Sequence, residues 1–182
     1  MTRIRSYVVA SLLVSIGTFG FQAVAAGQAP RRQEEVEVPG LGIKIKAGWR
    51  VLFADGCRFA APPSWHTAPG DKSLALAPDG SNLSVRIVRF SNWSDHKARI
   101  KAAYGQLKTV HEDTERRLWF EFGDERRTQH FIDVANAEGA CLALLELRVP
   151  TKLTSDDISR IADSVGPIPV HWPLDQSDHV KK

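Results

Sequence analysis

The chain has 182 residues, 43% hydrophobic and 25% charged, a composition typical of a globular protein and not of a disordered or collagen-like one. The formal net charge is +3, but Arg3 and Arg5 lie in a segment that we expect to be removed. Without these two of the 24 basic residues, 22 remain against 21 acidic ones, which argues against a nucleic-acid-binding surface.

The first 25 residues have the three regions of a secretory signal peptide. Arg3 and Arg5 precede an apolar run over residues 7–21, and residues 23–25 (AVA) fit the small-x-small cleavage pattern. Polar residues interrupt the apolar run, which favours cleavage over an uncleaved membrane anchor. We therefore expect an exported protein, periplasmic or extracellular, with no stable membrane anchor after cleavage.

Composition divides the rest of the chain into three parts. Polar residues and two prolines predict a flexible leader over residues 26–40, in which residues 35–38 form an edge strand. Residues 41–170 are expected to form a single α+β domain. Residues 171–182 have the composition of a polar C-terminal tail.

The domain contains a series of short apolar or alternating segments bounded by glycine, proline and asparagine. We expect strands over 41–53 (as a hairpin or two short strands), 57–61, 73–77, 83–90, 118–122, 128–135 and 140–149, and helices over 92–108 and 158–165. Short connections indicate antiparallel pairing, and the last strand is apolar on both faces, as a central strand would be. The predicted fold is α+β, an antiparallel β-sheet of about six strands flanked by helices on both faces.

This order of elements is similar to that of a known family. Together with the pair Pro63 and Trp65 at a strand exit, the turn at Gly80 and a last helix ending at Val165, it resembles the PsbP-like and Mog-like group of α/β/α sandwich proteins. The resemblance covers about residues 56–166. It implies an accessory or binding module, and the group shares no catalytic residues that could be transferred to this chain.

Two cysteines, Cys57 and Cys141, are a candidate disulfide. Each begins a predicted strand, so both could lie at the same end of the sheet, and exported proteins seldom keep free thiols. The bond would close a loop of about 84 residues, worth about 4–5 kcal/mol in the loop-entropy account. The alternative is a pair of separate, buried thiols.

No residue pattern in the chain matches a catalytic, metal-binding or cofactor-binding motif. The spacing of the six histidines (His66, His96, His111, His130, His171 and His179) fits no zinc motif, and a nucleophile elbow, a P-loop and a dinucleotide-binding fingerprint are absent. We therefore expect no catalytic residue, no metal site and no cofactor. A composite site, for example His130 with Glu121 across a hairpin, stays open because hairpin register is not readable from the sequence.

Two tryptophans carry further expectations. Trp119 alternates with Leu118 and Phe120, so it is expected to cover the opposite face of the sheet. Trp172, beyond the last helix, is either folded back on the domain or an exposed anchor for a partner.

The expected function is an exported, non-enzymatic accessory or protein-binding domain of the cell envelope, whose partner is another envelope or secreted protein. The alternative is a small secreted hydrolase or metal-dependent enzyme with a site assembled from scattered histidine, aspartate and serine residues. A deep pocket in which two or more histidines or acids converge would favour the enzyme. A shallow surface with exposed aromatic residues would favour the binding protein.

Overall fold

The computed structural model describes residues 35–104, 109–136 and 139–169. The predicted signal peptide, most of the leader, and the C-terminal tail with His171, Trp172 and His179 lie outside these ranges. Within the described ranges, no helix is long and apolar enough to cross a membrane.

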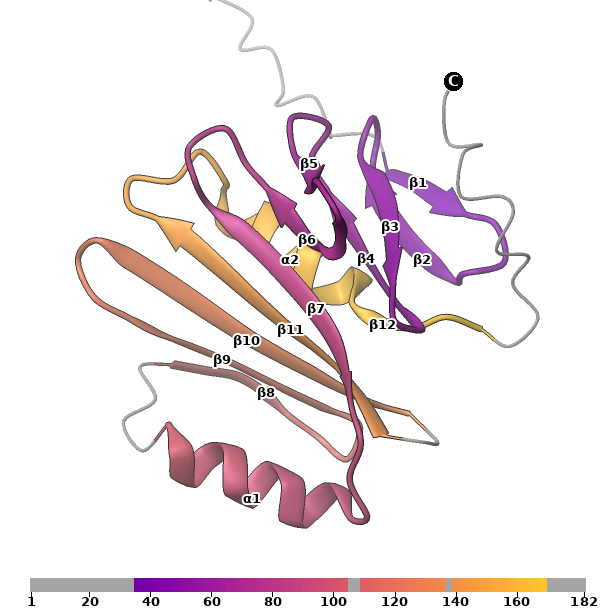
Figure 1. Ribbon diagram of the computed structural model, residues 1–182, viewed down its shortest axis with the longest axis vertical. Helices are drawn as coiled ribbons and strands as arrows, with labels where there is room; N and C mark the ends of the chain where they lie inside the picture. The colour runs from indigo at the N-terminus through magenta and orange to yellow at the C-terminus, as the bar shows by residue number, and fades with distance from the viewer. Residues whose placement is uncertain (1–34, 105–108, 137–138, 170–182) are drawn as a thin grey trace, which may run out of the picture. The chain divides into compact units, whose positions relative to one another are not determined.

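Twelve strands and two helices follow one another along the described residues (Figure 1). In chain order they are β1 (Glu35–Val38), β2 (Ile43–Lys46), β3 (Arg50–Ala54), β4 (Cys57–Ala61), β5 (His66–Ala68), β6 (Asp71–Leu76), β7 (Asn82–Val88), α1 (Trp93–Ala103), β8 (Thr109–Asp113), β9 (Arg117–Gly123), β10 (Arg127–Asn136), β11 (Gly139–Arg148), α2 (Ser155–Ser164) and β12 (Gly166–Pro167).

Seven strands form the main sheet in the order β5-β6-β7-β11-β10-β9-β8, and every neighbouring pair is antiparallel. The two-sided apolar strand β11 lies in the middle of this sheet, as its sequence predicts. Its successive residues Cys141, Leu142 and Ala143 are all buried, so both of its faces are covered.

The two faces of the main sheet are covered differently (Figure 1). On one face, Leu118 and Phe120 of β9 are fully buried in a cluster that also contains Trp93 and Ile100 of α1. Each such side chain contributes about 1.5–3 kcal/mol through burial. On the other face, the larger core joins the main sheet to α2, to the two-stranded sheet β1-β2 and to the three-stranded sheet β12-β4-β3.

The predicted fold class is therefore wrong: the described residues are mostly β, the main sheet has seven strands, and two further small sheets help to cover one of its faces, so the predicted layers of helices on both faces are not formed. Strands β3 and β4 do not extend the main sheet but pack on its face, where Phe59, Ala60 and Ala61 of β4 are fully buried. Strands β5 and β8 were not predicted, since His66–Ala68 and Thr109–Asp113 are short or largely polar.

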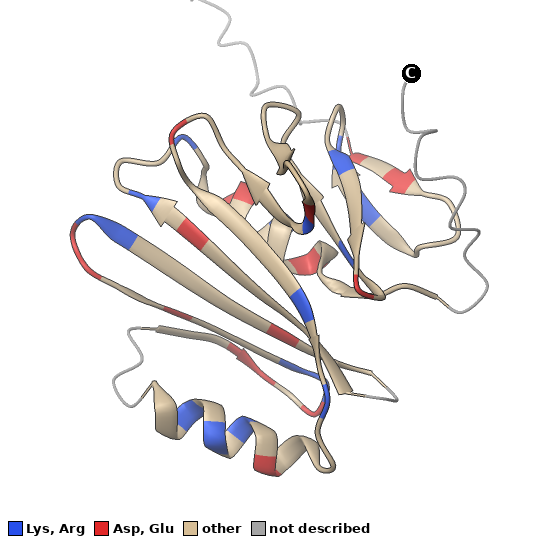
Figure 2. Ribbon diagram, viewed as in Figure 1, with Lys and Arg blue, Asp and Glu red and all other residues tan. Residues whose placement is uncertain are grey.

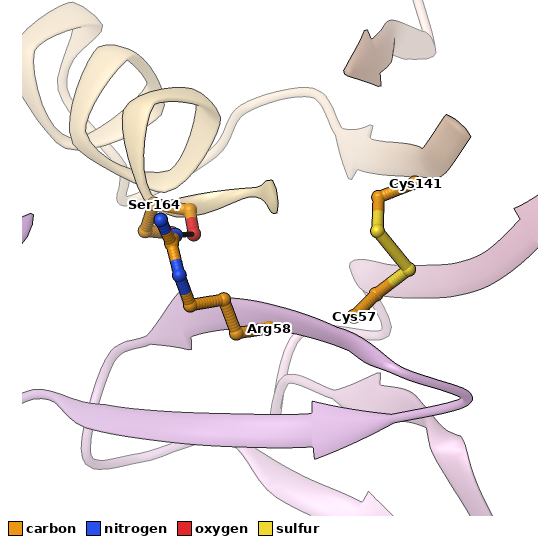
Figure 3. The surroundings of a disulfide bond; sticks show 4 residues. All are labelled: Cys57, Arg58, Cys141 and Ser164. Atoms are coloured by element: carbon orange, nitrogen blue, oxygen red, sulfur yellow. Dashed lines mark hydrogen bonds between the residues drawn. A yellow bond between two sulfur atoms is a disulfide. The ribbon is translucent and has the colours of Figure 1, made fainter. Parts of the chain in front are cut away.

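A disulfide joins Cys57 of β4 to Cys141 of β11, so the predicted pair does come together (Figure 3). The two Cα atoms are 5.7 Å apart, and neither cysteine is exposed to solvent. The next residue, Arg58, donates a hydrogen bond to the carbonyl oxygen of Ser164 at the end of α2. The disulfide thus ties the small sheet to the main sheet at the point where β4 also holds α2.

Charged residues of both signs are mixed over the strands and α1 (Figure 2). On α1, Lys97 and Lys101 both pair with Asp113 of β8, so this part of the basic helix surface is neutralised locally.

Candidate functional site

A pocket of about 350 Å³ lies between one face of the main sheet and the beginning of α2. Its sheet side is formed by His111, Trp119, Glu121 and His130 from the consecutive strands β8, β9 and β10. Its helix side is formed by Ser155, Ile158 and Ser159 of α2. It combines aromatic, ionisable and hydroxyl groups within one concave surface, as small-molecule sites commonly do.

Strand alternation sends the side chains of β9 to opposite faces. Leu118 and Phe120 belong to the core under α1, whereas Trp119 belongs to the core on the other face, as predicted. Glu121 has the same parity as Trp119 and lines the pocket beside it. The alternation that builds the core therefore also places a carboxylate on the wall of the pocket.

The register of the β9–β10 hairpin pairs Glu121 directly with His130. Directly opposite residues of antiparallel strands project their side chains on the same face, so both reach the pocket. Gly123 begins the turn with φ +147°, where an added Cβ would collide with the backbone carbonyl of Arg127. Gly123 therefore allows the tight turn between β9 and β10, and this turn sets the register that pairs Glu121 with His130.

His111 reaches the pocket from the edge strand β8 at a register shift. Val110 pairs with Phe120 and Glu112 pairs with Trp119, so His111 is the extra residue of a β-bulge. Bulges are enriched at sheet edges and beside active sites, where they re-aim a side chain. Here the His111 ring stacks on Trp119, with ring centroids 4.3 Å apart.

The ligand atoms of His111, Glu121 and His130 all lie within 4.8 Å of one another. His111 Nε2 lies 3.3 Å from Glu121 Oε2. His130 is only 3% exposed, whereas His111 and Glu121 lie closer to solvent. The His130 ring therefore lies deep in the pocket, whereas His111 and Glu121 lie nearer its opening.

This donor set suits a divalent transition-metal ion. Imidazole nitrogens and a carboxylate oxygen are common ligands of zinc, and catalytic zinc sites often use two histidines with one glutamate. Zinc–ligand bonds of about 2.1 Å at tetrahedral angles separate two ligand atoms by about 3.4 Å. The His111–Glu121 separation of 3.3 Å is close to that value. The ligand atom of His130 lies within 4.8 Å of the other two, so a side-chain adjustment would bring it into the same sphere.

Among the described residues that line the pocket, His111, Glu121 and His130 are the ionisable ones. The others supply hydroxyl groups or apolar surface: Trp119, Thr128, Leu147, Thr151, Ser155, Ile158 and Ser159. An ion held by the three ligands would therefore have hydroxyl and apolar neighbours, and no additional acid or base among these lining residues.

The other described histidines lie elsewhere. His66 is exposed on the edge strand β5. His96 is buried under α1, where its Nε2 atom lies 2.5 Å from Asp133 Oδ2 and its ring stacks on Phe90. His96 thus has a structural role with Asp133, whereas His111 and His130 meet in the pocket.

Sequence reasoning named the pair Glu121 and His130 only as an open possibility and missed His111. The register of β9 with β10 would have been needed to bring the first two together. His111 depends on β8 and on its bulge, and neither has a distinct sequence signal. The alternation of Trp119 with Leu118 and Phe120 was the one pattern that located the correct face.

Comparisons with known structures find distant likenesses. No protein-family model matches the chain, and no curated protein sequence matches it. A crystal structure of a Bacteroides thetaiotaomicron protein aligns with 69% of this chain and 50% of its own length, with a TM-score of 0.45 and 12% identity. The chain thus spans about half the length of that protein.

The solution structure of the cyanobacterial PsbP (CyanoP) of Synechocystis sp. PCC 6803 aligns with 72% of this chain and 98% of its own length. Its TM-score is 0.43 and its identity is 17%. A PsbP protein is therefore among the structural neighbours, as the sequence resemblance anticipates, whereas neither neighbour supports the Mog-like half of that resemblance. At these TM-scores, neither likeness carries an inference about function.

Proposed function

We propose that this chain is an exported binding domain that holds a divalent transition-metal ion, with zinc as the reference ion, at His111, Glu121 and His130. The observation that carries the proposal is the convergence of three ligand atoms, from three neighbouring strands, within 4.8 Å in one pocket. This function replaces the expectation of a chain without a metal site.

The ligand types decide the class of ion. Magnesium and calcium prefer sites made of oxygen atoms alone, whereas imidazole suits zinc, copper, iron and nickel. Two imidazoles with one carboxylate therefore favour a first-row transition metal. The single negative charge of Glu121 offsets half of the charge of a divalent ion, so the protein alone leaves the bound ion with a net charge of about +1.

The lining of the pocket favours binding over catalysis. General acid–base catalysis requires a positioned group that accepts or donates the proton. The described lining residues offer no ionisable group beyond the three ligands, and coordination would occupy those. This favours the expected non-enzymatic role, and we propose another envelope or secreted protein as the partner of the domain.

Export is supported by two independent features. Disulfides persist in oxidising compartments and are rare in the cytosol, and Cys57 and Cys141 are bonded across the fold. The first 25 residues have the pattern of a secretory signal peptide. A metal-binding domain of the envelope accounts for both features together with the pocket.

Calorimetric titration of zinc into the purified, oxidised protein tests the proposal. We expect one ion per chain, and at least about tenfold weaker binding in each of His111→Ala, Glu121→Gln and His130→Ala, because each variant loses one of three ligands. His66→Ala is the matched control, since His66 is exposed outside the pocket. Absence of zinc binding by the folded wild type, or equal binding by the three variants, would overturn the proposal.

The competing function is a metal-dependent hydrolase, which is favoured by the same convergence of two histidines and an acid. A three-ligand zinc site leaves a position for water, whose pKa the metal lowers. Turnover of p-nitrophenyl acetate or p-nitrophenyl phosphate by the zinc-loaded protein, lost in Glu121→Gln, would establish this function in place of simple binding.

A further inference from the structure

Resting on the proposed metal site, we propose that the pocket binds its metal ion together with a small organic anion that has an oxygen-donor head group, such as a carboxylate or a hydroxamate. The head group would complete the coordination of the metal. The remainder of the molecule would occupy the space between the metal ligands and α2.

Coordination number gives the first argument. His111, Glu121 and His130 supply three ligand atoms, whereas zinc takes four or five ligands and other first-row divalent ions take up to six. At least one position therefore remains for a ligand from outside the protein. Because the ion and Glu121 together carry about +1, an anionic ligand matches this position better than a neutral or cationic one.

The size of the pocket gives the second argument. Its volume of about 350 Å³ lies within the range of small-molecule sites. A water molecule takes up about 30 Å³ in the liquid, so a bare ion with its few coordinated waters would leave much of this space to additional solvent. A small organic ligand fills the space that the ion does not need.

The hydroxyl groups around the metal ligands, from Thr128 on β10 and from Ser155 and Ser159 on α2, give the third argument. The hydroxyl groups of Thr128, Ser155 and Ser159 take part in no hydrogen bond with any described residue. Thr151 accepts a hydrogen bond from the backbone N–H of Leu153 through its hydroxyl oxygen, and its own proton is still available for donation. These hydroxyls can donate to the oxygen atoms of an anion, and such charge-assisted bonds are stronger than neutral ones.

Apolar groups on the same walls select an organic molecule over an inorganic anion. Trp119, Leu147 and Ile158 line the same pocket as the ionisable and the hydroxyl groups. Phosphate or sulfate would leave these apolar surfaces in contact with water. A ligand with a short hydrocarbon or aromatic part would cover them and gain about 25 cal/mol for each Å² removed from water.

The test is a calorimetric titration in two stages with benzohydroxamate, a bidentate oxygen-donor anion that carries a phenyl ring. The first stage titrates zinc alone into the protein. The second titrates benzohydroxamate into the zinc-loaded protein and, in parallel, into the zinc-free protein. We expect saturable binding to the zinc-loaded protein and at least tenfold weaker binding without zinc.

Two comparisons separate the contributions of the pocket walls. The double variant Ser155→Ala/Ser159→Ala should bind zinc within about twofold of wild type but benzohydroxamate at least fivefold more weakly, because it loses two donors to the anion. Ser94→Ala is the control, since Ser94 is exposed on α1 and outside the pocket. Acetohydroxamate, which lacks the ring, should bind more weakly than benzohydroxamate.

The outcomes distinguish this inference from the proposed function. Absence of zinc binding in the first stage overturns the metal site itself. Zinc binding without any hydroxamate binding in the second stage overturns only the organic ligand. Equal hydroxamate affinity for wild type and the double serine variant overturns the hydroxyl wall as the recognition surface.

Discussion

His96 of α1 and Asp133 of β10 form a buried pair, with His96 Nε2 2.5 Å from Asp133 Oδ2. Asp133 is not exposed at all, and its second oxygen has no hydrogen-bond partner among the described residues. Burial raises the pKa of Asp133, although the hydrogen bond and the charge of His96 oppose this. The pair is thus a buried polar link between α1 and the sheet, in addition to the pairs of Lys97 and Lys101 with Asp113 nearer the surface.

Replacing His96 by alanine should destabilise the fold strongly. The carboxyl group of Asp133 would lose its one described side-chain partner while staying buried, and removal of one member of a buried pair costs about 3–5 kcal/mol. The measurement is urea unfolding followed by circular dichroism. The exposed His66→Ala serves as control and should stay within about 0.5 kcal/mol of wild type. Similar losses in both variants would contradict the role of the pair.

The turn at Gly123 should tolerate no side chain. In Gly123→Ala the new Cβ would meet the carbonyl of Arg127, whereas in Gly70→Ala it would meet nothing within 4 Å, although both glycines have positive φ. We expect a cost of about 1–2 kcal/mol for Gly70→Ala from backbone conformation alone. Gly123→Ala should cost more and should also weaken zinc binding, because the turn sets the Glu121–His130 register. Equal unfolding midpoints for the two variants would exclude this explanation.

Asp157 should make the fold sensitive to acid. Burial alone would raise its pKa, but hydrogen bonds from Lys46 and from Thr154 outweigh burial, so the pKa lies below its ordinary value. A lowered pKa in the folded state contributes stability that is present above about pH 4 and is lost as the pH falls through the folded pKa.

Asp157→Ala should therefore be about 1–2 kcal/mol less stable than wild type at pH 7, because it also removes half of the capping box of α2. This difference should shrink below about pH 4, where the wild-type carboxylate takes up its proton. Unfolding by urea at a series of pH values measures it. The control is Asp156→Ala in the same helical turn, which removes only an exposed ion pair with Arg160 and should change the stability little. If the stability difference between Asp157→Ala and wild type did not depend on pH, the proposed link between the pKa of Asp157 and folding would be refuted.

Removing the disulfide should lower stability without changing the fold. The double variant Cys57→Ala/Cys141→Ala releases a loop of 84 residues, for which a loss of about 4–5 kcal/mol is expected in the loop-entropy account. Thermal unfolding measures the loss, and thiol titration of the denatured, unreduced wild type provides the independent check. Two titratable thiols in that sample would show that the bond is absent from the protein.

Several local features of the fold followed from patterns in the sequence, although the predicted fold class did not hold. The alternation of Leu118, Trp119 and Phe120 set the two faces of β9, and the two-sided apolar segment of β11 predicted a central strand. The N-cap of α2 is Thr154, which forms a capping box with Asp157, a spacing that is visible in the sequence. These features depend on neighbours in the chain, so periodicity and cap chemistry reveal them.

The parts that sequence reasoning missed depend on contacts between distant residues. Nothing in the sequence of β4 itself shows whether the strand belongs to the main sheet or packs on its face. Its position depends on the core residues from other elements that surround Phe59. The candidate site is similar: Glu121 and His130 meet through strand register, and His111 joins them through a bulge. Neither register nor bulge leaves a reliable mark in one sequence.

The bond between Cys57 and Cys141 also determines what a single cut in the backbone can do. A protease that cleaves the chain at any point between these two residues produces two fragments that stay covalently joined. The fragments still share the core that joins the main sheet to the small sheets. The strands that carry His111, Glu121 and His130 also stay attached to α2 as long as the disulfide is oxidised. Where the protein meets proteases, the disulfide would thus preserve the pocket after a single cut in the chain that would otherwise separate its halves.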